Sequence, residues 1–355
     1  MWNDFSLIRT KTKGLNRKFN LSDPVERQEY FQAKVGKEIK VIKDYLQNNT
    51  FIAYLLGKKN SGKGTYTKLM AEIFGKNKIG HISVGDIVRD AYADAQDKKK
   101  KQELVDYTKK NYRGYISFDE AFNALVNKSQ DKLLPTEFIL TLVKKEIDKM
   151  DRKTLFIDGF PRDLDQISYS LYFRDLINYR DDPDVFVAID IPDAVIDERI
   201  KNRVVCPKCH TPRSLKLLTT KNVGYDKKKK EFYLMCDDPA CHQERMVAKE
   251  GDNLGIETIR KRLELDGQLI KKVLSLHGIP KILLRNAIPV DKAEELVDSY
   301  EVTPEFSYEY DKKRDKVITH QKSWIVKDNQ GVESISLMAP AVVVSFIRQL
   351  ANVFK

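Results

Sequence analysis

A phosphate-binding loop is predicted between residues 57 and 65. The sequence GKKNSGKGT fits the pattern G-x4-G-K-[ST] with one glycine inserted before Thr65, and it separates an apolar run from a helical pattern. Glycines let backbone N–H groups approach an anion, and the start of the following helix adds partial positive charge. We expect Lys63 to contact the outer phosphates of a nucleotide held by Gly57, Asn60, Ser61, Gly62, Lys63, Gly64 and Thr65.

The cysteines form a second candidate site. Cys206 and Cys209 are separated by two residues, Cys236 and Cys241 by four, and all four fall within 36 residues. Such clustering in a long chain favours a metal over disulfides. Four thiolates suit a closed, tetrahedral zinc site that stabilises a small segment with little core of its own. The alternative is four free thiols.

Five arginines stand where they could neutralise phosphate. Arg162 follows a Gly-Phe-Pro turn. Arg199 and Arg203 share one helical face just before the cysteines, and Arg260 and Arg262 open a helix just after them. A guanidinium group binds phosphate at two points, and phosphoryl transfer depends mostly on positioning and charge neutralisation. The set therefore favours phosphoryl chemistry over five independent surface arginines.

Composition and charge limit the class of protein. The 355 residues are 41% hydrophobic and 32% charged, which is typical of a globular chain. No apolar run is long enough to span a bilayer, and the first residues lack the apolar block of a secretion signal, so we expect a cytoplasmic protein without membrane contact. The net charge of +11 suits nucleotides or a nucleic-acid backbone, although the lysine runs at 98–101 and 227–230 are typical of solvated loops.

An α/β fold is expected to position these residues. Continuous apolar runs are typical of parallel strands buried on both faces, and helical stretches between them indicate crossover connections; the runs lie at 51–56, 154–158 and 185–190, and the helical stretches at 65–74, 136–149 and 163–178. Ligands bind at the carboxyl ends of such strands. The first run ends at the glycine-rich loop and the second at Asp158 and Gly159, so both should open onto one crevice.

The remaining segments are expected to be additions to this sheet. A helix is predicted from Asp23 to about Gln47, helical structure within 96–131, and a helix at 256–276. A short strand and a helix are expected at 281–297, followed by hairpin strands and a C-terminal helix in the tail after residue 300.

The region 51–285 resembles adenylate kinases that have a long, zinc-bearing lid. Seven motifs occur in the order found in that family: GKKNSGKGT, HISVGDIVR, KLLPTEFILTLV, LFIDGFPRDLDQ, IDERIKNR, CPKC and ETIRKRL. The resemblance implies a P-loop core at 51–299. Within it would lie a flap at 81–135 that binds the acceptor nucleotide and contains an insertion at 96–131, and a zinc lid at 204–251. Residues 1–50 and 300–355 would be extensions.

The resemblance also implies an activity and residue roles. The protein would transfer the γ-phosphoryl group of Mg-ATP to AMP and release two ADP. Arg89 and Arg162 would hold the α-phosphate of AMP, Arg199 and Arg203 the donor phosphates, and Arg262 the transferred group. Asp158 would orient Mg²⁺ through water. With Lys63 these would be the catalytic residues, and the acceptor site would comprise Val84, Arg89, Leu134, Gly159, Arg162, Gln166, Arg203 and Arg262.

Two departures from the family pattern concern specificity and rate. Gln166 matches the glutamine that reads adenine, which favours AMP, but Val84 stands where the family commonly has threonine, and this favours a UMP/CMP kinase as the alternative. Lys249 stands where a donor-side arginine is expected, and lysine cannot bind phosphate as a fork.

Two further departures lie in the phosphate loop and the lid. Asn60 replaces a loop glycine, which asparagine tolerates because it adopts left-handed conformations readily. The second cysteine pair is two residues longer than usual, which leaves room for Asp237, Asp238, His210 or His242 as a zinc ligand. A zinc-ribbon protein that binds nucleic acid and uses the loop for regulation is a more distant alternative. We expect a monomer that binds nucleotides rather than nucleic acid.

Overall fold

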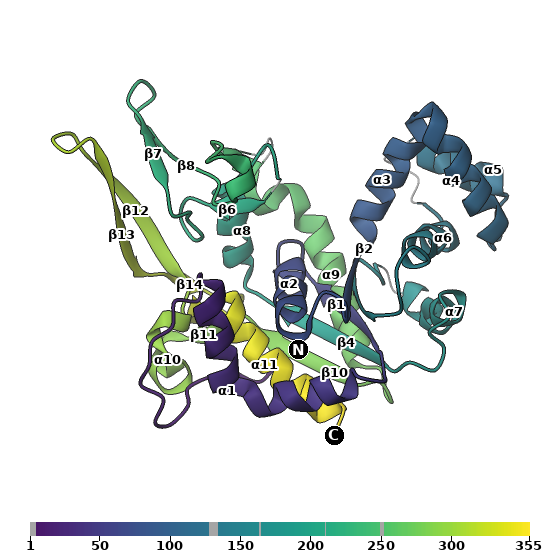
Figure 1. Ribbon diagram of the computed structural model, residues 1–355, viewed down its shortest axis with the longest axis horizontal. Helices are drawn as coiled ribbons and strands as arrows, with labels where there is room; N and C mark the ends of the chain where they lie inside the picture. Colours follow the sequence, from purple (N-terminus) through teal and green to yellow (C-terminus); the bar gives the residue numbers. More distant parts are fainter. Residues whose placement is uncertain (1–4, 128–133, 163–164, 210, 249–251) are drawn as a thin grey trace.

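A five-stranded parallel sheet forms the centre of the molecule (Figure 1). The computed structural model describes the chain except for residues 1–4, 128–133, 163–164, 210 and 249–251. The strand order is β10-β4-β1-β3-β2, and the bounds are β1 Ile52–Gly57, β2 Ile79–Ser83, β3 Thr154–Asp158, β4 Asp184–Asp190 and β10 Lys281–Arg285. The predicted α/β fold is confirmed. Strand β2, which holds an exposed His81 and a glycine, was not anticipated as a strand.

Helices cover both faces of the sheet, and this explains the continuous apolar runs. Along β1, Ala53 and Leu55 pack on one side with α1 (Pro24–Tyr45), α2 (Lys63–Phe74) and α11 (Ala339–Val353). Ile52, Tyr54 and Leu56 pack on the other side with α6 (Thr136–Ile147), α7 (Ser170–Leu176) and α9 (Arg260–Leu274). Because neither face meets water, polar residues do not alternate with apolar ones along these strands.

The N-terminal segment and the tail meet on one face of the sheet. The side chain of Asp23 accepts hydrogen bonds from the backbone N–H groups of Val25 and Glu26 and so caps α1, as predicted. Farther along α1, the buried Lys34 Nζ lies 2.7 Å from Asp298 Oδ2 and 3.5 Å from Glu301 Oε1. The Glu301 carboxylate also accepts hydrogen bonds from Thr10 and Tyr30. These buried charges are paired, and they join the two ends of the chain.

Two further units lie near the carboxyl ends of the strands (Figure 1). The flap consists of α3 (Val84–Gln96), α4 (Lys98–Asn111) and α5 (Phe118–Asn127), which share a small apolar core with α6. The lid follows α8 (Asp193–Lys201) and contains β5 (Arg203–Val205), β6 (Pro212–Ser214), β7 (Val223–Asp226), β8 (Glu231–Leu234), η3 (Pro239–Cys241) and β9 (Val247–Ala248). Helical structure within 96–131 is therefore confirmed.

The tail forms a long hairpin and contributes two strands to a small sheet whose third strand, β11, precedes it. The sheet has the order β11-β15-β14, with bounds Ala287–Pro289, Glu333–Ser336 and Ile325–Lys327, and the hairpin pairs β12 (Pro304–Asp311) with β13 (Lys316–Ser323). The remaining elements are η2 (Asp165–Tyr169), η4 (Asp252–Ile259), α10 (Val290–Leu296) and η5 (Ser299–Glu301). Within the described residues no helix is both long and apolar enough to cross a membrane.

Candidate active site

The predicted phosphate loop connects β1 to α2 through two left-handed residues. Asn60 has φ +64° and Gly62 has φ +101°, so the expected tolerance of asparagine at position 60 agrees with the backbone there. Gly57 lies in a tight turn, because a Cβ on it would come within 2.7 Å of Ser61 Oγ and 3.1 Å of Ile189 Cβ. Ser61 Oγ and Asn60 Nδ2 are buried and find no hydrogen-bond partner among the described residues. These two atoms could form hydrogen bonds with a ligand bound at the loop.

Lys63 lies at the centre of this loop. Its Nζ donates to the carbonyl oxygens of Gly57, at 2.8 Å, and Lys58, at 3.1 Å. The same Nζ is 3.7 Å from Asp158 Oδ1 at the end of β3. The side chain of Lys58 turns the other way and forms an ion pair with Asp193 at the start of α8. The ammonium group of Lys63 is therefore the loop cation that faces the neighbouring strand end.

Two arginines reach the loop, Arg199 from α8 and Arg203 from the first residue of β5. The predicted shared helical face is therefore wrong, because α8 ends at Lys201. Arg199 Nη1 donates to the Asn60 carbonyl at 3.1 Å, and Arg203 Nη1 donates to Asn60 Oδ1 at 3.3 Å. Arg203 also forms a two-point ion pair with Asp252, with N–O distances of 2.6 and 2.7 Å. Burial lowers the pKa of Arg199, an effect that the nearby Tyr66 opposes. An anion beside Asn60 would lie within reach of both guanidinium groups.

A second group of arginines lies around Arg162, which follows the end of β3. Arg162 Nε donates to the Gly159 carbonyl at 2.8 Å, and a Cβ on Gly85 would come within 3.0 Å of Arg162 Nη2. Burial and the neighbouring Arg262 lower the pKa of Arg162, Asp158 raises it, and Arg89 lowers it further. Mutual repulsion of three guanidinium groups is the interaction that a bound phosphate would relieve.

Helix partners hold two of these arginines. Arg262 Nε donates to Asp266 Oδ1 at 3.0 Å, one turn along α9, and Arg89 pairs with Asp86 on the exposed side of α3. The second carboxylate oxygen of Asp266 is buried without a partner among the described residues. Arg260 instead pairs with Glu257 at the surface, so only Arg262 of this pair turns toward Arg162.

Side chains expected to surround the acceptor base lie next to Arg162. Gln166 is buried; its Oε1 accepts from the Arg162 N–H at 2.7 Å, and its Nε2 donates to Thr136 Oγ1 at 3.1 Å. Val84 is buried beside Gly159, where a glycine Cβ would lie 3.6 Å from Val84 Cβ. Leu134 is half-buried against the apolar cluster of the flap. The amide of Gln166 is therefore held in a defined orientation between η2 and α6.

The four cysteines come together as expected. Their Sγ atoms all lie within 4.8 Å of one another, and Cys209 Sγ is 3.6 Å from Cys236 Sγ. A tetrahedron of thiolates around zinc, with bonds of about 2.3 Å, requires sulfur separations of about 3.8 Å, so the donor set fits this metal. Hydrogen bonds with Thr211 lower the pKa of Cys209 to about 6, which favours the thiolate form.

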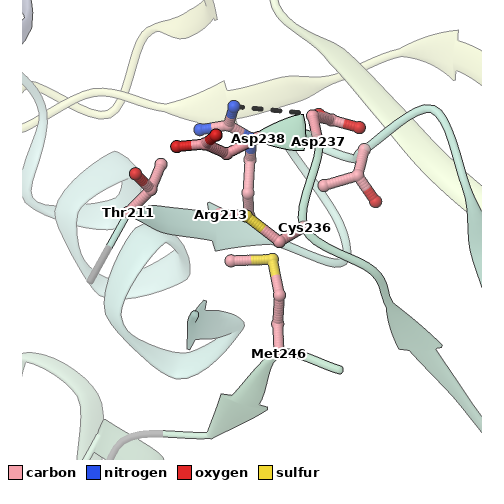
Figure 2. A pocket seen from close by; sticks show the side chains of 7 residues that line it. Thr211, Arg213, Cys236, Asp237, Asp238 and Met246 are labelled. Carbon is pink, nitrogen blue, oxygen red and sulfur yellow. Dashed lines mark ion pairs between the residues drawn. The ribbon is translucent and has the colours of Figure 1, made fainter. Parts of the chain in front are cut away.

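Two of the alternative zinc ligands, Asp237 and Asp238, form hydrogen bonds with backbone groups. Asp237 Oδ1 accepts from the Lys221 N–H, and Asp238 Oδ1 caps η3 at Ala240. His242 is exposed and is not part of the cysteine group, while His210 lies outside the described residues. Cys236 and Met246 line a cavity of about 260 Å³ beside the thiols, in which Arg213 forms an ion pair with Asp237 at 3.8 Å (Figure 2).

Comparison with known proteins identifies the family. The chain is 30% identical to adenylate kinase of Thermotoga petrophila over 239 residues, which cover 66% of this chain and 89% of that protein. It is 29% identical to adenylate kinase of Clostridium tetani over 231 residues, or 65% and 88% of the two chains. The chain belongs to the adenylate kinase family. No protein-family model matches it.

A second kind of kinase also appears among the relatives of this adenylate kinase family member. "Probable UMP-CMP kinase 2" of Arabidopsis thaliana is 27% identical over 207 residues, which cover 57% of this chain and 68% of that protein. The identity is lower and the shared region shorter than for the two adenylate kinases above.

Sequence reasoning missed several residues of the adenylate kinase site. The sequence patterns assigned no role to three residues that hold site side chains. Asp252 pairs with Arg203, Asp193 pairs with Lys58, and Thr136 accepts a hydrogen bond from Gln166. Of these three residues, only Asp252 could have been predicted from the sequence. It follows directly after the lid, and an acidic residue near predicted arginines is a candidate ion-pair partner. Lys249, expected on the donor side, lies outside the described residues.

Proposed function

We propose that the protein is an adenylate kinase that reversibly transfers the γ-phosphoryl group of Mg-ATP to AMP and forms two ADP. The observation that carries the proposal is the placement of cations on both sides of Lys63. Arg199 and Arg203 lie on one side, at Asn60, and Arg162 with its neighbours Arg89 and Arg262 lies on the other, at Gly159 and Gly85. Two phosphate chains that meet end to end need two such groups.

The donor would bind across the phosphate loop. Lys63 would exchange the carbonyl oxygens of Gly57 and Lys58 for oxygens of the outer phosphates, and backbone N–H groups of the loop would cradle the chain. Arg199 and Arg203 would neutralise the donor phosphates. Arg203 would then bind phosphate in competition with Asp252, which holds its guanidinium group at two points.

Mg²⁺ bound with ATP would neutralise charge on the outer phosphates. Asp158 would hold it through water, because this carboxylate lies at the end of β3 beside Lys63 and is partly exposed. Zinc in the cysteine cluster would have a structural role, since four thiolates leave no open coordination position.

The acceptor would bind between the flap and η2. Arg162 and Arg89 would hold the α-phosphate of AMP, and Arg262 would bridge toward the phosphoryl group in transfer. Gln166 would read adenine, since an amide both donates and accepts, and its bonds to Arg162 and Thr136 set its orientation. The second candidate, a UMP/CMP kinase, is favoured by one observation: the buried Val84 offers no hydrogen bond to a base.

Purified protein tests the proposal in a coupled assay for ADP. We expect ADP from ATP and AMP in the presence of Mg²⁺, and no ADP from ATP alone, because an enzyme that excludes water does not use it as the acceptor. A panel of AMP, UMP and CMP at equal concentration separates the two candidates. Absence of ADP with every monophosphate at all Mg²⁺ concentrations contradicts a nucleotide kinase of either kind.

A further inference from the structure

The tail hairpin β12–β13 lies along the lid hairpin β7–β8 (Figure 1). Near the tips, the rings of Tyr225 in the lid and Tyr310 in the tail stack with centroids 4.4 Å apart and planes 19° from parallel. Lys227, two residues after Tyr225, has its Nζ 3.0 Å from Asp315 Oδ1. The two hairpins are therefore joined at their outer ends by an aromatic pair and an ion pair.

The hairpins are also joined near the base of the lid. The Tyr308 hydroxyl donates to the Leu215 carbonyl at 2.7 Å and lies 2.8 Å from Thr219 Oγ1. The Phe306 N–H donates to the Lys216 carbonyl at 2.7 Å. The side chain of Lys216 contacts Glu305 of the tail at 3.5 Å and Glu198 of α8 at 3.1 Å. Glu198 precedes the donor-side Arg199, so this contact reaches the edge of the site.

The other end of the tail hairpin is fixed in the core. Before β12, the Thr303 N–H donates to the Ser336 carbonyl at 2.8 Å, and Val302 forms a bridge with Leu337. After β13, Trp324 is buried against Val195, Ile196 and Leu263 of α8 and α9. The hairpin is thus an arm with a buried root and a half-exposed attachment to the lid.

An arm attached at both ends resists rotation of the lid relative to the core. If the lid moves, either the buried root or the lid attachment must give way. The root consists of backbone bonds and a buried tryptophan. The attachment has a backbone bond and the Tyr308 hydroxyl near the base of the lid, whereas its outer end is made of half-buried rings and an exposed ion pair. The weaker contacts yield first, because exposed pairs contribute least to stability.

We propose that β12–β13 is a positioning element that holds the lid in its resting place, so that donor binding must release the Tyr225–Tyr310 contact. The proposal rests on the proposed function, since it names the ATP-binding step as the one affected. An aromatic pair shifts an equilibrium by about 2- to 12-fold. The apparent affinity for a ligand is the intrinsic affinity multiplied by the fraction of protein in the state that can bind it. The arm lowers the fraction with a released lid, so it should weaken ATP binding about 2- to 12-fold.

Steady-state kinetics of the full chain with Tyr310→Ala test the proposal. We expect the KM for ATP to fall about 2- to 12-fold and the KM for AMP to stay unchanged, since the flap does not touch this hairpin's aromatic contacts. Ile318→Ala is the matched control. Ile318 pairs with Glu309, on the face of the hairpin opposite to Tyr308 and Tyr310, so its truncation should leave both KM values alone. An unchanged or raised KM for ATP in Tyr310→Ala overturns the proposal.

Hydrogen exchange without nucleotide gives a readout that needs no activity. We expect Tyr310→Ala to accelerate amide exchange in residues 223–234 of the lid and Ile318→Ala not to do so. If Tyr310→Ala fails to fold, Asp315→Asn weakens the same attachment through Lys227. Equal exchange rates in the wild type and Tyr310→Ala would contradict the proposal that β12–β13 holds the lid, whatever the enzymatic activity. If exchange is faster in the variant but the protein makes no ADP, the proposal that β12–β13 holds the lid is supported and only the proposed kinase activity is contradicted.

Discussion

Lys63 Nζ lies 3.7 Å from the Asp158 carboxylate, at the neighbouring ends of β1 and β3. This pair joins the residue proposed to bind the donor phosphates to the residue proposed to hold their metal. The lysine is only partly exposed, and its hydrogen bonds go to two loop carbonyls. Its charge is therefore in place before any nucleotide arrives, and little rearrangement is needed on binding.

Lys63→Met should remove most of the activity without unfolding the protein. The ammonium group contacts backbone oxygens that water can satisfy, while the loss of a cation at the transferred group costs about 10²–10³-fold in kcat. Lys68→Met, in the same helix but exposed, is the control and should retain full activity. Equal activity of the two variants in the ADP assay would contradict the role of Lys63.

Two glycine-to-alanine changes should have opposite effects on stability. Gly57→Ala places a Cβ 2.7 Å from Ser61 Oγ and 3.1 Å from Ile189 Cβ, which should cost about 1–3 kcal/mol and distort the loop. Gly267→Ala in α9 meets nothing within 4 Å and should stabilise the protein by about 0.5–1 kcal/mol. Urea unfolding measures both, and a stabilised Gly57→Ala would show that the loop is not tightly packed.

Gln166→Ala should affect AMP more than other acceptors. The change removes the amide proposed to read adenine and leaves Thr136 and the Arg162 N–H without their partner. We expect the KM for AMP to rise by about 10-fold, which corresponds to one good hydrogen bond, with little change in the KM for ATP. Val84→Thr is the companion variant and should lower the KM for AMP. A uniform loss with AMP, UMP and CMP would indicate damage to η2 rather than lost recognition.

Asp190 should make stability depend on pH. Burial raises the pKa of this carboxyl to about 7 from the ordinary value of 3.8, although Arg285 and Lys58 act in the opposite direction. The unfolded chain therefore loses the proton first, so the contribution of Asp190 to stability is fully present below pH 4 and is lost as the pH rises through about 7. Between pH 5 and 8 the wild type should lose about 3 kcal/mol more than Asp190→Asn. Exposed Asp291→Asn serves as control, and parallel pH profiles for all three proteins would refute the assignment.

If the cysteine cluster holds zinc as proposed, removal of the metal should loosen the lid but leave the core folded. The apolar cluster of the lid contains Cys206, Cys236 and Cys241 besides Val204, Leu234 and Met246, so the metal site makes up about half of that core. Chelation should lower the melting temperature, and Cys241→Ser should bind less zinc by elemental analysis. Chelator should have no further effect on Cys241→Ser. A full, unchanged zinc content in that variant would exclude Cys241 as a ligand.

The sequence predicted those features whose signal is local. The phosphate loop, the apolar strands, the capped start of α1 and the cysteine pairs each depend on residues close together in the chain, and each is found as expected. Strand β15 (Glu333–Ser336) was missed because its residues are mostly polar, although it lies between two other strands.

Contacts between distant segments were beyond the reach of sequence patterns. The Arg203–Asp252 pair joins residues on either side of the lid sequence, and the Tyr225–Tyr310 stack joins two hairpins that are far apart in the chain. The same holds for Lys34 with Glu301, which places two charges in a buried site. Pairing of this kind depends on tertiary geometry, since each residue alone is more typical of a surface.

The joined ends of the chain have a consequence for biosynthesis. Helix α1 is synthesised before its packing partner α11 and before Glu301, whose carboxylate pairs with Lys34. Both lie about three hundred residues farther along the chain. Until then the apolar face formed by α2 and the strands stays uncovered. A nascent chain in which α11 has not yet been made therefore exposes apolar surface that chaperones can bind.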